Sequence, residues 1–347
     1  MSTRNPADAR GERKKINIAL QGGGAHGAFA WGVLDRLLED ERLEVEGLVG
    51  TSAGAMNAAV VAYGLSRGGP PAARECLEGF WRRIAGAACF SPLQPSFLDR
   101  MMPTGSIDMS PGWMFYDAIS RIFSPYQLNP LNINPLRDVL AASVDCETIH
   151  TVQRVKLFVC ASNVMTGRIK VFDERNVSID AIMASACLPF LFQAVEVDGE
   201  YYWDGGYMGN PPLYPLIYRC ESRDVLIIQI NPIRINELPT SAQAILDRIN
   251  TLSFNSSLMR EMRAINFVTK LIDRGFDDDG RLKRMLIHTI DAEETFNQLG
   301  VSSKLNADWA FLTQLFELGR ERASSFLDQH FDDIGQRSST RIEEKFL

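Results

Sequence analysis

The sequence predicts an α/β fold in which helices cover both faces of a mainly parallel sheet. Two observations predict it: strand-like and helix-like segments alternate through the first 66 residues, and further short apolar runs recur later in the chain. Strands that alternate with helices usually run parallel, because each crossover helix packs back onto the sheet. Hydrophobic residues make up 46% of the 347 positions, which is enough to bury a sizeable core.

The first four elements follow from the spacing of apolar residues. Residues 16–20 form a short apolar run typical of a strand, and residues 25–40 carry apolar side chains at helical intervals. A second strand over 45–50 and an alanine-rich helix over 53–65 complete a βαβα unit. Later strands are expected over 155–161, 195–203, 225–230 and 285–290.

Residues 86–135, here called the insert, interrupt this alternation. They hold seven of the 16 prolines and only five charged residues, together with many methionine and aromatic side chains. A long, weakly charged connection with flexible apolar side chains is typical of a lid over an apolar pocket. The alternative is a buried loop of a subdomain, which the same composition also suits.

Composition divides the chain into three parts. Residues 1–15 are polar and mixed in charge, which favours a flexible N-terminus, and most of the expected strands fall within residues 16–239. After Pro239 there is no proline, and apolar residues recur at helical intervals. We therefore expect residues 240–347 to form a mostly helical C-terminal extension.

Charge and cysteine usage narrow the class of function. A net charge of −7 argues against a nucleic-acid partner, since phosphate binding needs concentrated lysine and arginine, and any contact with lipid is expected to be local and apolar. Six cysteines without C-x-x-C spacing, and an N-terminus without a secretory signal, favour reduced thiols in the cytoplasm and no zinc site. The uncharged stretches 16–34 and 47–66 contain glycine turns, so neither predicts a membrane span.

Ser52 is the first candidate for chemistry. It is the central residue of Gly50-Thr51-Ser52-Ala53-Gly54, a G-x-S-x-G pattern placed between a predicted strand and a predicted helix. The two glycines permit a tight strand-to-helix turn that points the serine hydroxyl outward, as a nucleophile requires. The alternative is an N-cap serine of the following helix, which needs only one of these glycines.

A glycine-rich loop follows the first predicted strand. The backbone N–H groups of Gly22, Gly23 and Gly24, which no side chain shields, can point at one spot and stabilise an oxyanion. With Gly27 the loop also satisfies the G-x-G-x-x-G fingerprint, so a dinucleotide-binding oxidoreductase that uses a nicotinamide or a flavin is a rival. That rival needs an acidic residue at the end of the second strand, but here the acidic residues lie at its start.

The base that would accept the serine proton must come from elsewhere in the chain. A histidine triad is disfavoured, because no histidine lies in a glycine-rich or turn-rich setting after the acid, and Ser52 comes too early for the strands that precede the nucleophile in α/β-hydrolases. Asp204, which ends a predicted strand and precedes Gly205 and Gly206, is the alternative. A dry pocket would raise its pKa from about 3.9 and make it a better base. On spacing alone, Asp-Gly-Gly also fits a plain hairpin turn.

Four sequence blocks together resemble the patatin-like phospholipases. They are Q-G-G-G-A-H-G-A-F at 21–29, G-T-S-A-G-A at 50–55, A-S-A-C-L-P-F-L-F at 184–192 and D-G-G at 204–206, in the order found in that family. The resemblance covers most of residues 16–235 and implies a three-layer α/β/α fold. It also implies a Ser–Asp dyad and an oxyanion hole, carried by Ser52 and Asp204, by Gly22, Gly23 and Gly24, and by the supporting glycines Gly27, Gly50, Gly54, Gly205 and Gly206.

The resemblance implies a patatin-like catalytic domain over 16–239 that hydrolyses carboxylic esters of lipids by acyl transfer. Such a reaction requires no metal or organic cofactor, and the acidic run at 277–280 lacks the ligand spacing of a calcium loop. The expected partners are a lipid or fatty-acyl ester substrate and a membrane surface contacted transiently through the insert. We therefore expect a cytoplasmic protein that is peripheral to a membrane.

Two points stay open at the level of sequence. Many relatives carry a basic or aliphatic residue where this chain has His26, and an imidazole there can simply pack or hydrogen-bond beside the loop. A catalytically silent lipid-sensing module is a third interpretation, besides the hydrolase and the oxidoreductase. The intact chemistry of all four blocks counts against it.

Overall fold

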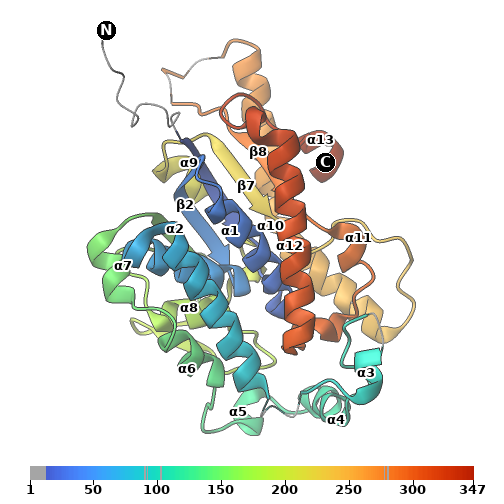
Figure 1. Ribbon diagram of the computed structural model, residues 1–347. Coiled ribbons are helices and arrows are strands. Elements are labelled where there is room, and N and C mark those ends of the chain that lie inside the picture. The colour runs from blue at the N-terminus through green and yellow to red at the C-terminus, as the bar shows by residue number, and fades with distance from the viewer. Residues whose placement is uncertain (1–12, 90, 92, 102–103, 277, 280) are drawn as a thin grey trace.

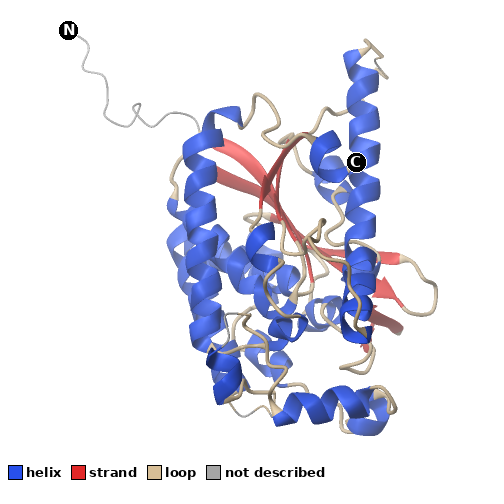
Figure 2. Ribbon diagram, turned by 90° about the vertical axis from the view of Figure 1, so that its right-hand side faces the viewer, coloured by secondary structure: helices blue, strands red, loops and turns tan. Residues whose placement is uncertain are grey.

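The sheet and its helical layers come from the alternation of strands and helices along the chain. The structure is a computed structural model, which describes residues 13–89, 91, 93–101, 104–276, 278–279 and 281–347. An eight-stranded sheet lies between two layers of helices, and Figure 2 shows the strands nearly edge-on with helices on either side. The predicted three-layer α/β/α class is confirmed.

The sheet is parallel in its centre and antiparallel at one side. Its order is β5-β6-β3-β2-β1-β7-β8, with β4 also paired to β3 (Figure 1). Neighbouring strands among β3, β2, β1, β7 and β8 run parallel, whereas β4 and β6 are antiparallel to β3 and β5 is antiparallel to β6. The strands are β1 Lys14–Leu20, β2 Leu43–Thr51, β3 Lys156–Asn163, β4 Ile169–Asp173, β5 Val195–Val197, β6 Glu200–Asp204, β7 Asp224–Ile228 and β8 Leu286–Ile290.

Helices connect these strands and cover both faces. The α-helices are α1 Gly27–Glu39, α2 Ala53–Ala88, α3 Phe97–Met101, α4 Pro111–Ser120, α5 Pro125–Leu128, α6 Pro135–Ala141, α7 Cys146–Val152, α8 Ile179–Ser185, α9 Tyr214–Arg219, α10 Ala242–Asp273, α11 Glu293–Phe296, α12 Trp309–His330 and α13 Ile342–Phe346. Short 3-10 helices are η2 Gly24–His26, η3 Gly205–Tyr207, η4 Val301–Leu305 and η5 Phe331–Asp333.

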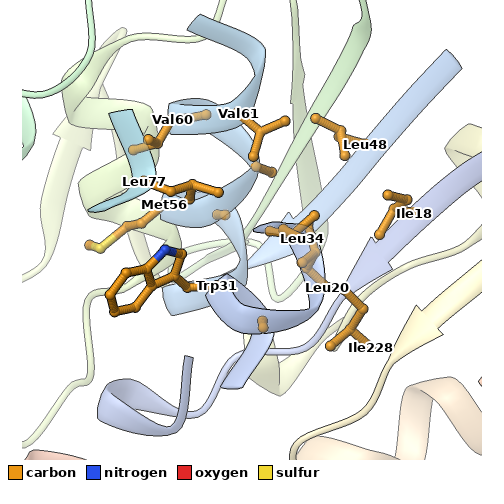
Figure 3. Close-up of a cluster of buried hydrophobic side chains, with 14 of the residues drawn as sticks. Ile18, Leu20, Trp31, Leu34, Leu48, Met56, Val60, Val61, Leu77 and Ile228 are labelled. Carbon is orange, nitrogen blue, oxygen red and sulfur yellow. The ribbon is translucent and has the colours of Figure 1, made fainter. Parts of the chain in front are cut away.

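Each face of the sheet has its own apolar core. The larger core lies under α1, α2, α8 and α12, and Figure 3 shows Leu34 of α1 next to the strand residue Leu20, with Trp31 and Met56 beside each other among the helices. Side chains of α9, α10 and α13 form the second core on the other face. A strand that is buried on both faces consists of a continuous run of apolar residues, so the central strands could be predicted from the sequence.

The segment after residue 239 belongs to the same packed body. Its strand β8 pairs with β7, and α12 lies along α1. The two helices approach closely because a Cβ at Gly32 or at Gly319 would meet the backbone of the facing helix. Asp35 of α1 accepts hydrogen bonds from Arg74 of α2 at 2.8 Å and from Arg320 of α12, which joins the three helices. The division into a domain at 16–239 and an extension stays a prediction.

Three elements differ from the sequence prediction. The strand predicted over 195–203 is the hairpin of β5 and β6, because Asp198 and Gly199 both have positive φ and turn the chain. Strand β4 was not predicted. Helix α2 continues past residue 65 to Ala88, although its backbone is non-helical at Gly68 and Gly69, just before Pro70.

The insert carries α3, α4 and α5 and lies at the end of the molecule toward which β1 runs (Figure 1). Most of its large apolar side chains are exposed, among them Phe115 at 70%, Ile122 at 76% and Leu131 at 80%. Ile107, by contrast, is fully buried, and its N–H donates to Ser302 Oγ of η4 at 2.9 Å. Further hydrogen bonds and an ion pair join the insert to residues 190–194 and 300–308, so it is held at several points while it presents apolar side chains to its surroundings.

Candidate active site

The glycine-rich loop and Ser52 lie at the carboxyl ends of adjacent parallel strands, and Asp204, which ends the antiparallel strand β6, pairs with Ala161 near the carboxyl end of β3. In the register of the sheet, Leu20 at the end of β1 lies beside Gly50 of β2 on one side and Ile228 of β7 on the other. The glycine-rich loop follows β1, Ser52 follows β2, and residues 229–231 follow β7. Ligands of open parallel sheets commonly bind at this edge, because the loops that leave the strands meet there.

Ser52 occupies a strained turn between β2 and α2. Its φ of 57° lies in the left-handed region that non-glycine residues rarely adopt. The backbone N–H of Ser52 donates to Ser185 Oγ of α8 at 2.9 Å, and Thr51 Oγ1 donates to the carbonyl of Gly209 at 2.7 Å. The residue is 8% exposed, so little of it reaches solvent. A sharp turn of this kind presents the hydroxyl at the edge of the sheet.

The two glycines of this turn permit the backbone to fold tightly. A Cβ at Gly50 would meet the carbonyl oxygen of Gly54, and a Cβ at Gly54 would meet the carbonyl oxygen of Leu20. Gly27 has a related role, because a Cβ there would lie 2.9 Å from Cβ of Ala53 at the start of α2. The predicted supporting glycines therefore bring α1, α2 and the end of β1 together.

Asp204 ends β6 and is fully buried. Its Oδ1 accepts from the N–H of Gly206 at 2.7 Å, which fixes the carboxyl at the start of η3. Burial raises the pKa of Asp204 to about 7, against the opposing effects of the Gly206 N–H and the Ser52 hydroxyl. Oδ2 has no hydrogen-bond partner of ordinary geometry in the described part of the chain. The Ser52 hydroxyl is thus near enough to act on the carboxyl, and Oδ2 remains available to accept a proton.

The glycines after Asp204 serve close packing. A Cβ at Gly205 would meet the carbonyl oxygen of Cys160 in β3, and a Cβ at Gly206 would meet the ring of Phe254 in α10. The Asp-Gly-Gly segment is therefore wedged between the sheet and a helix. It is not an exposed hairpin turn.

The glycine-rich loop approaches Ser52 directly. A Cβ at Gly22 would lie 2.6 Å from Cβ of Ser52 and 2.8 Å from the carbonyl oxygen of Thr51. The N–H of Gly22 donates to Oδ1 of Asn210 at 2.7 Å. Among the described residues, no hydrogen-bond acceptor is recorded for the N–H groups of Gly23 and Gly24. Among the described residues, the N–H groups of Gly23 and Gly24 are therefore available to donate to a ligand, whereas the N–H of Gly22 already donates to Asn210.

His26 packs beside the loop and forms no hydrogen bond with Ser52 or Asp204. Its Nε2 pairs with Ser303 Oγ at 2.7 Å, and its ring lies 5.2 Å from the ring of Phe296, centroid to centroid. Burial lowers the pKa of His26 well below its usual value, and the nearby charge of Lys304 lowers it further. The imidazole is therefore neutral near pH 7.

The remaining histidines of the chain are hydrogen-bonded elsewhere. His150 pairs with the carbonyl of Val177, His288 with Asp224 and Ser339, and His330 with Asp333. No hydrogen bond joins any of the four imidazoles to Ser52, all of these residues being described.

Several residues that support the site escaped the sequence prediction. Ser185 lies in the block at 184–192, which was quoted for the family resemblance without a role for any member. Asn210 accepts from Gly22 and follows the Asp-Gly-Gly block by only four residues, so proximity in sequence was an available signal. Asn231 donates from Nδ2 to the Gly22 carbonyl at 2.7 Å, and Lys304 donates to Asn231 Oδ1 at 3.0 Å. For these last two no local pattern existed.

The described residues show neither a metal site nor a membrane-spanning helix. Among the residues described, no group of three or more histidine, cysteine or acidic side chains is arranged to hold a metal ion. The acidic run at 277–280 lies partly outside the described residues, because Asp277 and Gly280 are not described. Within the same part of the chain, every helix is too short or too polar to cross a bilayer.

A serine on a strained strand-to-helix turn, a glycine-rich loop beside it and a buried carboxyl thus lie together in a three-layer α/β/α protein. The family model described as patatin-like phospholipase matches residues 18–217, more than half of the chain. The chain therefore belongs to the patatin-like phospholipase family, which supports lipid hydrolysis as its class of function. The match spans the glycine-rich loop.

Solved structures give two more distant similarities. VipD from Legionella pneumophila is 16% identical, with a TM-score of 0.44, over 91% of this chain and 67% of that one. The ExoU–SpcU complex of the Pseudomonas aeruginosa type III secretion system is 16% identical, with a TM-score of 0.31, over 94% of this chain and 62% of that one. No curated protein sequence matches.

Proposed function

We propose that the protein is a serine lipid acyl hydrolase in which Ser52 is the nucleophile and Asp204 is its base. One observation carries the proposal: a fully buried carboxyl with a pKa raised to about 7 lies beside the hydroxyl of a serine held in a strained turn. A base whose pKa is near the working pH is both ionised and strong enough to remove a serine proton. Lipid acyl esters are the substrate class because the family hydrolyses lipids.

The proposed reaction proceeds in two acyl transfers. Oγ of Ser52 bonds to the ester carbonyl carbon while its proton moves to Oδ2 of Asp204, and an oxyanion forms. The oxyanion collapses, the bond to the leaving alcohol breaks, and the alcohol takes the proton from Asp204. Water then attacks the acyl-enzyme carbonyl and gives up a proton to Asp204. As this second oxyanion collapses, the bond from the acyl carbon to Oγ of Ser52 breaks, Oγ takes the proton from Asp204, and the fatty acid is released.

The oxyanion in this proposal is stabilised by Gly23 and Gly24. Their N–H groups have no recorded acceptor within the described chain, whereas the N–H of Gly22 is engaged by Asn210. A preorganised donor in a buried site is worth roughly 10²- to 10³-fold in rate. We assign to Gly22 the close contact with Ser52 that brings the loop to the nucleophile.

We further propose that the insert contacts a membrane surface transiently. Its exposed apolar side chains include Phe97, Met101, Met114, Phe115, Ile122 and Leu131. Asp117 of α4 and Arg121, which follows α4, act electrostatically on Asp247 of α10. Lys304, beside the glycine-rich loop, acts on Asp247 as well, so the insert lies near the loop side of the site. A lipid surface bound there would be adjacent to the nucleophile.

Electrostatics contribute little to this membrane contact. Residues 86–135 contain three acidic and two basic side chains, so they do not attract anionic lipid. Association through apolar insertion is insensitive to salt, unlike binding through a basic patch. We therefore expect contact with zwitterionic surfaces as well as anionic ones.

The decisive experiment measures hydrolysis of a soluble chromogenic acyl ester and of a lipid mixture by variants with a matched control. Ser52→Ala is expected to abolish both activities, and a fluorophosphonate probe is expected to label Ser52 alone. Asp204→Asn is expected to lower the rate by orders of magnitude while the protein stays folded.

The control is Glu261→Gln. Glu261 is another buried carboxyl whose pKa burial raises to about 7, but it accepts from the N–H groups of Leu213 and Tyr214. This variant is expected to retain activity. Undiminished hydrolysis by Ser52→Ala would refute the proposal, and no hydrolysis by the wild-type protein would favour a catalytically silent lipid-sensing module.

A further inference from the structure

A chain of hydrogen bonds joins the C-terminal part of the molecule to the glycine-rich loop. Nζ of Lys304, in η4, donates to Oδ1 of Asn231 at 3.0 Å. Nδ2 of Asn231 donates in turn to the carbonyl oxygen of Gly22 at 2.7 Å. The chain thus begins at the Lys304 side chain and ends at the peptide group that joins Gly22 to Gly23.

That peptide group is polarised in a useful direction. Its carbonyl belongs to Gly22 and its N–H belongs to Gly23, and the two are conjugated in one planar unit. A donor on the carbonyl draws electron density away from the nitrogen, so the N–H becomes a stronger donor; such cooperative strengthening is about 10–30% per bond. The N–H of Gly23 is one of the two donors without a recorded acceptor among the described residues.

Backbone contacts, besides the side chain, hold Lys304 in place. Its own backbone carbonyl packs against Gly24, where a Cβ would collide with it, and Gly24 has a φ of 59°. The neighbouring Ser303 pairs with His26 at 2.7 Å. Because these contacts fix η4 against the loop independently of the Lys304 side chain, the side chain can be changed without removing η4.

A carboxyl acts electrostatically on the Lys304 side chain. Burial lowers the pKa of Lys304, and the carboxyl of Asp247 on α10 acts in the opposite direction. Asp247 has a pKa raised to about 6, chiefly by its own burial, so it is ionised at neutral pH and favours the ammonium form.

From these contacts we infer that Lys304 is a positioning residue for the acyl-transfer reaction: acting through Asn231, it orients and polarises the Gly22–Gly23 peptide, so that the Gly23 N–H stabilises the oxyanion. This role rests on the proposed function and adds to it two residues, 231 and 304, that lie beyond the family match at 18–217. Neither residue touches the substrate in this arrangement.

The test compares Lys304→Met with Lys283→Met on the soluble chromogenic ester. Lys283 is a matched control: it is also a partly buried lysine whose pKa is lowered by burial, and its Nζ donates to the carbonyl of Cys220, far from the loop. Lys304→Met is expected to lower kcat about tenfold with KM changed less than twofold, because the lost polarisation acts on the transition state. Lys304→Arg, which keeps the charge and a donor, is expected to recover most of kcat.

A double-mutant cycle separates the relay from simple bracing. Asn231→Ala is expected to lower kcat as much as Lys304→Met, and the double variant no further, since both changes break one chain. Additive losses would overturn the inference, as would an unchanged kcat in Lys304→Met or an equal loss in Lys283→Met. The thermal midpoint of each variant is measured alongside, and a loss of kcat only in variants that are partly unfolded would also overturn it.

Ser52→Ala is assayed in the same series. If Ser52→Ala is inactive and Lys304→Met has full activity, only the relay fails. If Ser52→Ala retains wild-type activity, the proposed function fails and the relay fails with it.

Discussion

The carboxyl edge of the sheet and the insert are opposites in construction. At the sheet edge, Asp204 is fully buried and Ser52 nearly so, and hydrogen bonds join the glycine-rich loop and Ser52 to three other segments. In the insert, Phe115 and Ile122 are largely exposed and α4 has no fully buried residue. Under the proposed function, the sheet edge would hold the reacting groups in place, while the insert would contact the bulky apolar substrate. Changes at the sheet edge and changes in the insert should therefore affect ester hydrolysis and lipid contact differently.

The largest expected effect comes from Gly22→Ala. The new Cβ would lie 2.6 Å from Ser52 Cβ and 2.8 Å from a backbone oxygen, so the loop must move away from the nucleophile. We expect hydrolysis of a soluble ester to fall on the order of 10³-fold, the scale of a lost oxyanion donor. Sedimentation with lipid vesicles should be unchanged, because the insert is untouched. A rate within threefold of wild type would show that the loop does not serve the reaction.

Burial of Asp204 should make the free energy of unfolding depend on pH. Its pKa is about 7 when folded and about 3.9 when unfolded, so the folded state binds more protons between these pH values. The stability given by the protonated carboxyl is complete below about pH 4 and is lost as the pH rises through 7. At pH 8, Asp204→Asn should therefore be more stable than wild type by up to about 4 kcal/mol.

Denaturant unfolding at pH 5 and pH 8 checks this sign. Glu261→Gln should also gain stability at pH 8, because its carboxyl has a similarly raised pKa, yet only Asp204→Asn should lose activity. The same titration predicts that kcat/KM of the wild type falls as the pH drops below about 7, since the base must be ionised. A flat profile from pH 5 to 8 would argue against Asp204 as the base.

Substitution in the insert should give a smaller and selective effect. Replacing Met114 and Phe115 together by aspartate places two charges where an apolar surface would enter a bilayer. We expect hydrolysis of lipid in zwitterionic vesicles to fall about tenfold, with hydrolysis of a soluble ester unchanged. Tyr218→Asp is the control, because Tyr218 is 81% exposed but lies on α9, outside the insert. Equal losses on both substrates would mean that the insert supports the sheet edge and not membrane contact.

Gly86→Ala has the smallest expected effect. A Cβ at Gly86 meets nothing within 4 Å, and the residue is helical near the end of α2 where the insert begins. Alanine in a helix is more stable than glycine by roughly 0.5–1 kcal/mol. A small rise in the thermal midpoint with unchanged activity on both substrates would show that α2 extends this far. A fall would indicate that the end of α2 needs glycine.

Local signals account for the parts of the molecule that could be predicted. The turn at Ser52 needs glycine on both sides within five residues, and the central strands are continuous apolar runs, so both are visible in sequence. The hairpin of β5 and β6 was missed although Asp198-Gly199 is a strong hairpin signal, because the flanking residues on both sides suit a strand. Strand β4 has only five residues and lies between turns, which leaves little periodicity to detect.

Long-range contacts account for what could not be predicted. Lys304 lies 282 positions after Gly22, and no spacing rule connects a residue of a 3-10 helix to a loop so far away in the chain. The raised pKa of Asp204 has the same origin, since burial from several elements produces it and no sequence pattern records that burial. Sequence thus identified the candidate reacting groups and left their surroundings to the fold.

The position of η4 has a consequence for how the protein comes into being. Residues 302–304 contact the insert through Ser302, the first loop through Ser303, and residue 231 through Lys304. During synthesis Ser52 emerges from the ribosome some 250 residues before these contacts can form. A nascent chain that has not yet reached residue 304 therefore lacks these contacts, so under the proposed function the oxyanion site is completed only long after Ser52 has been made.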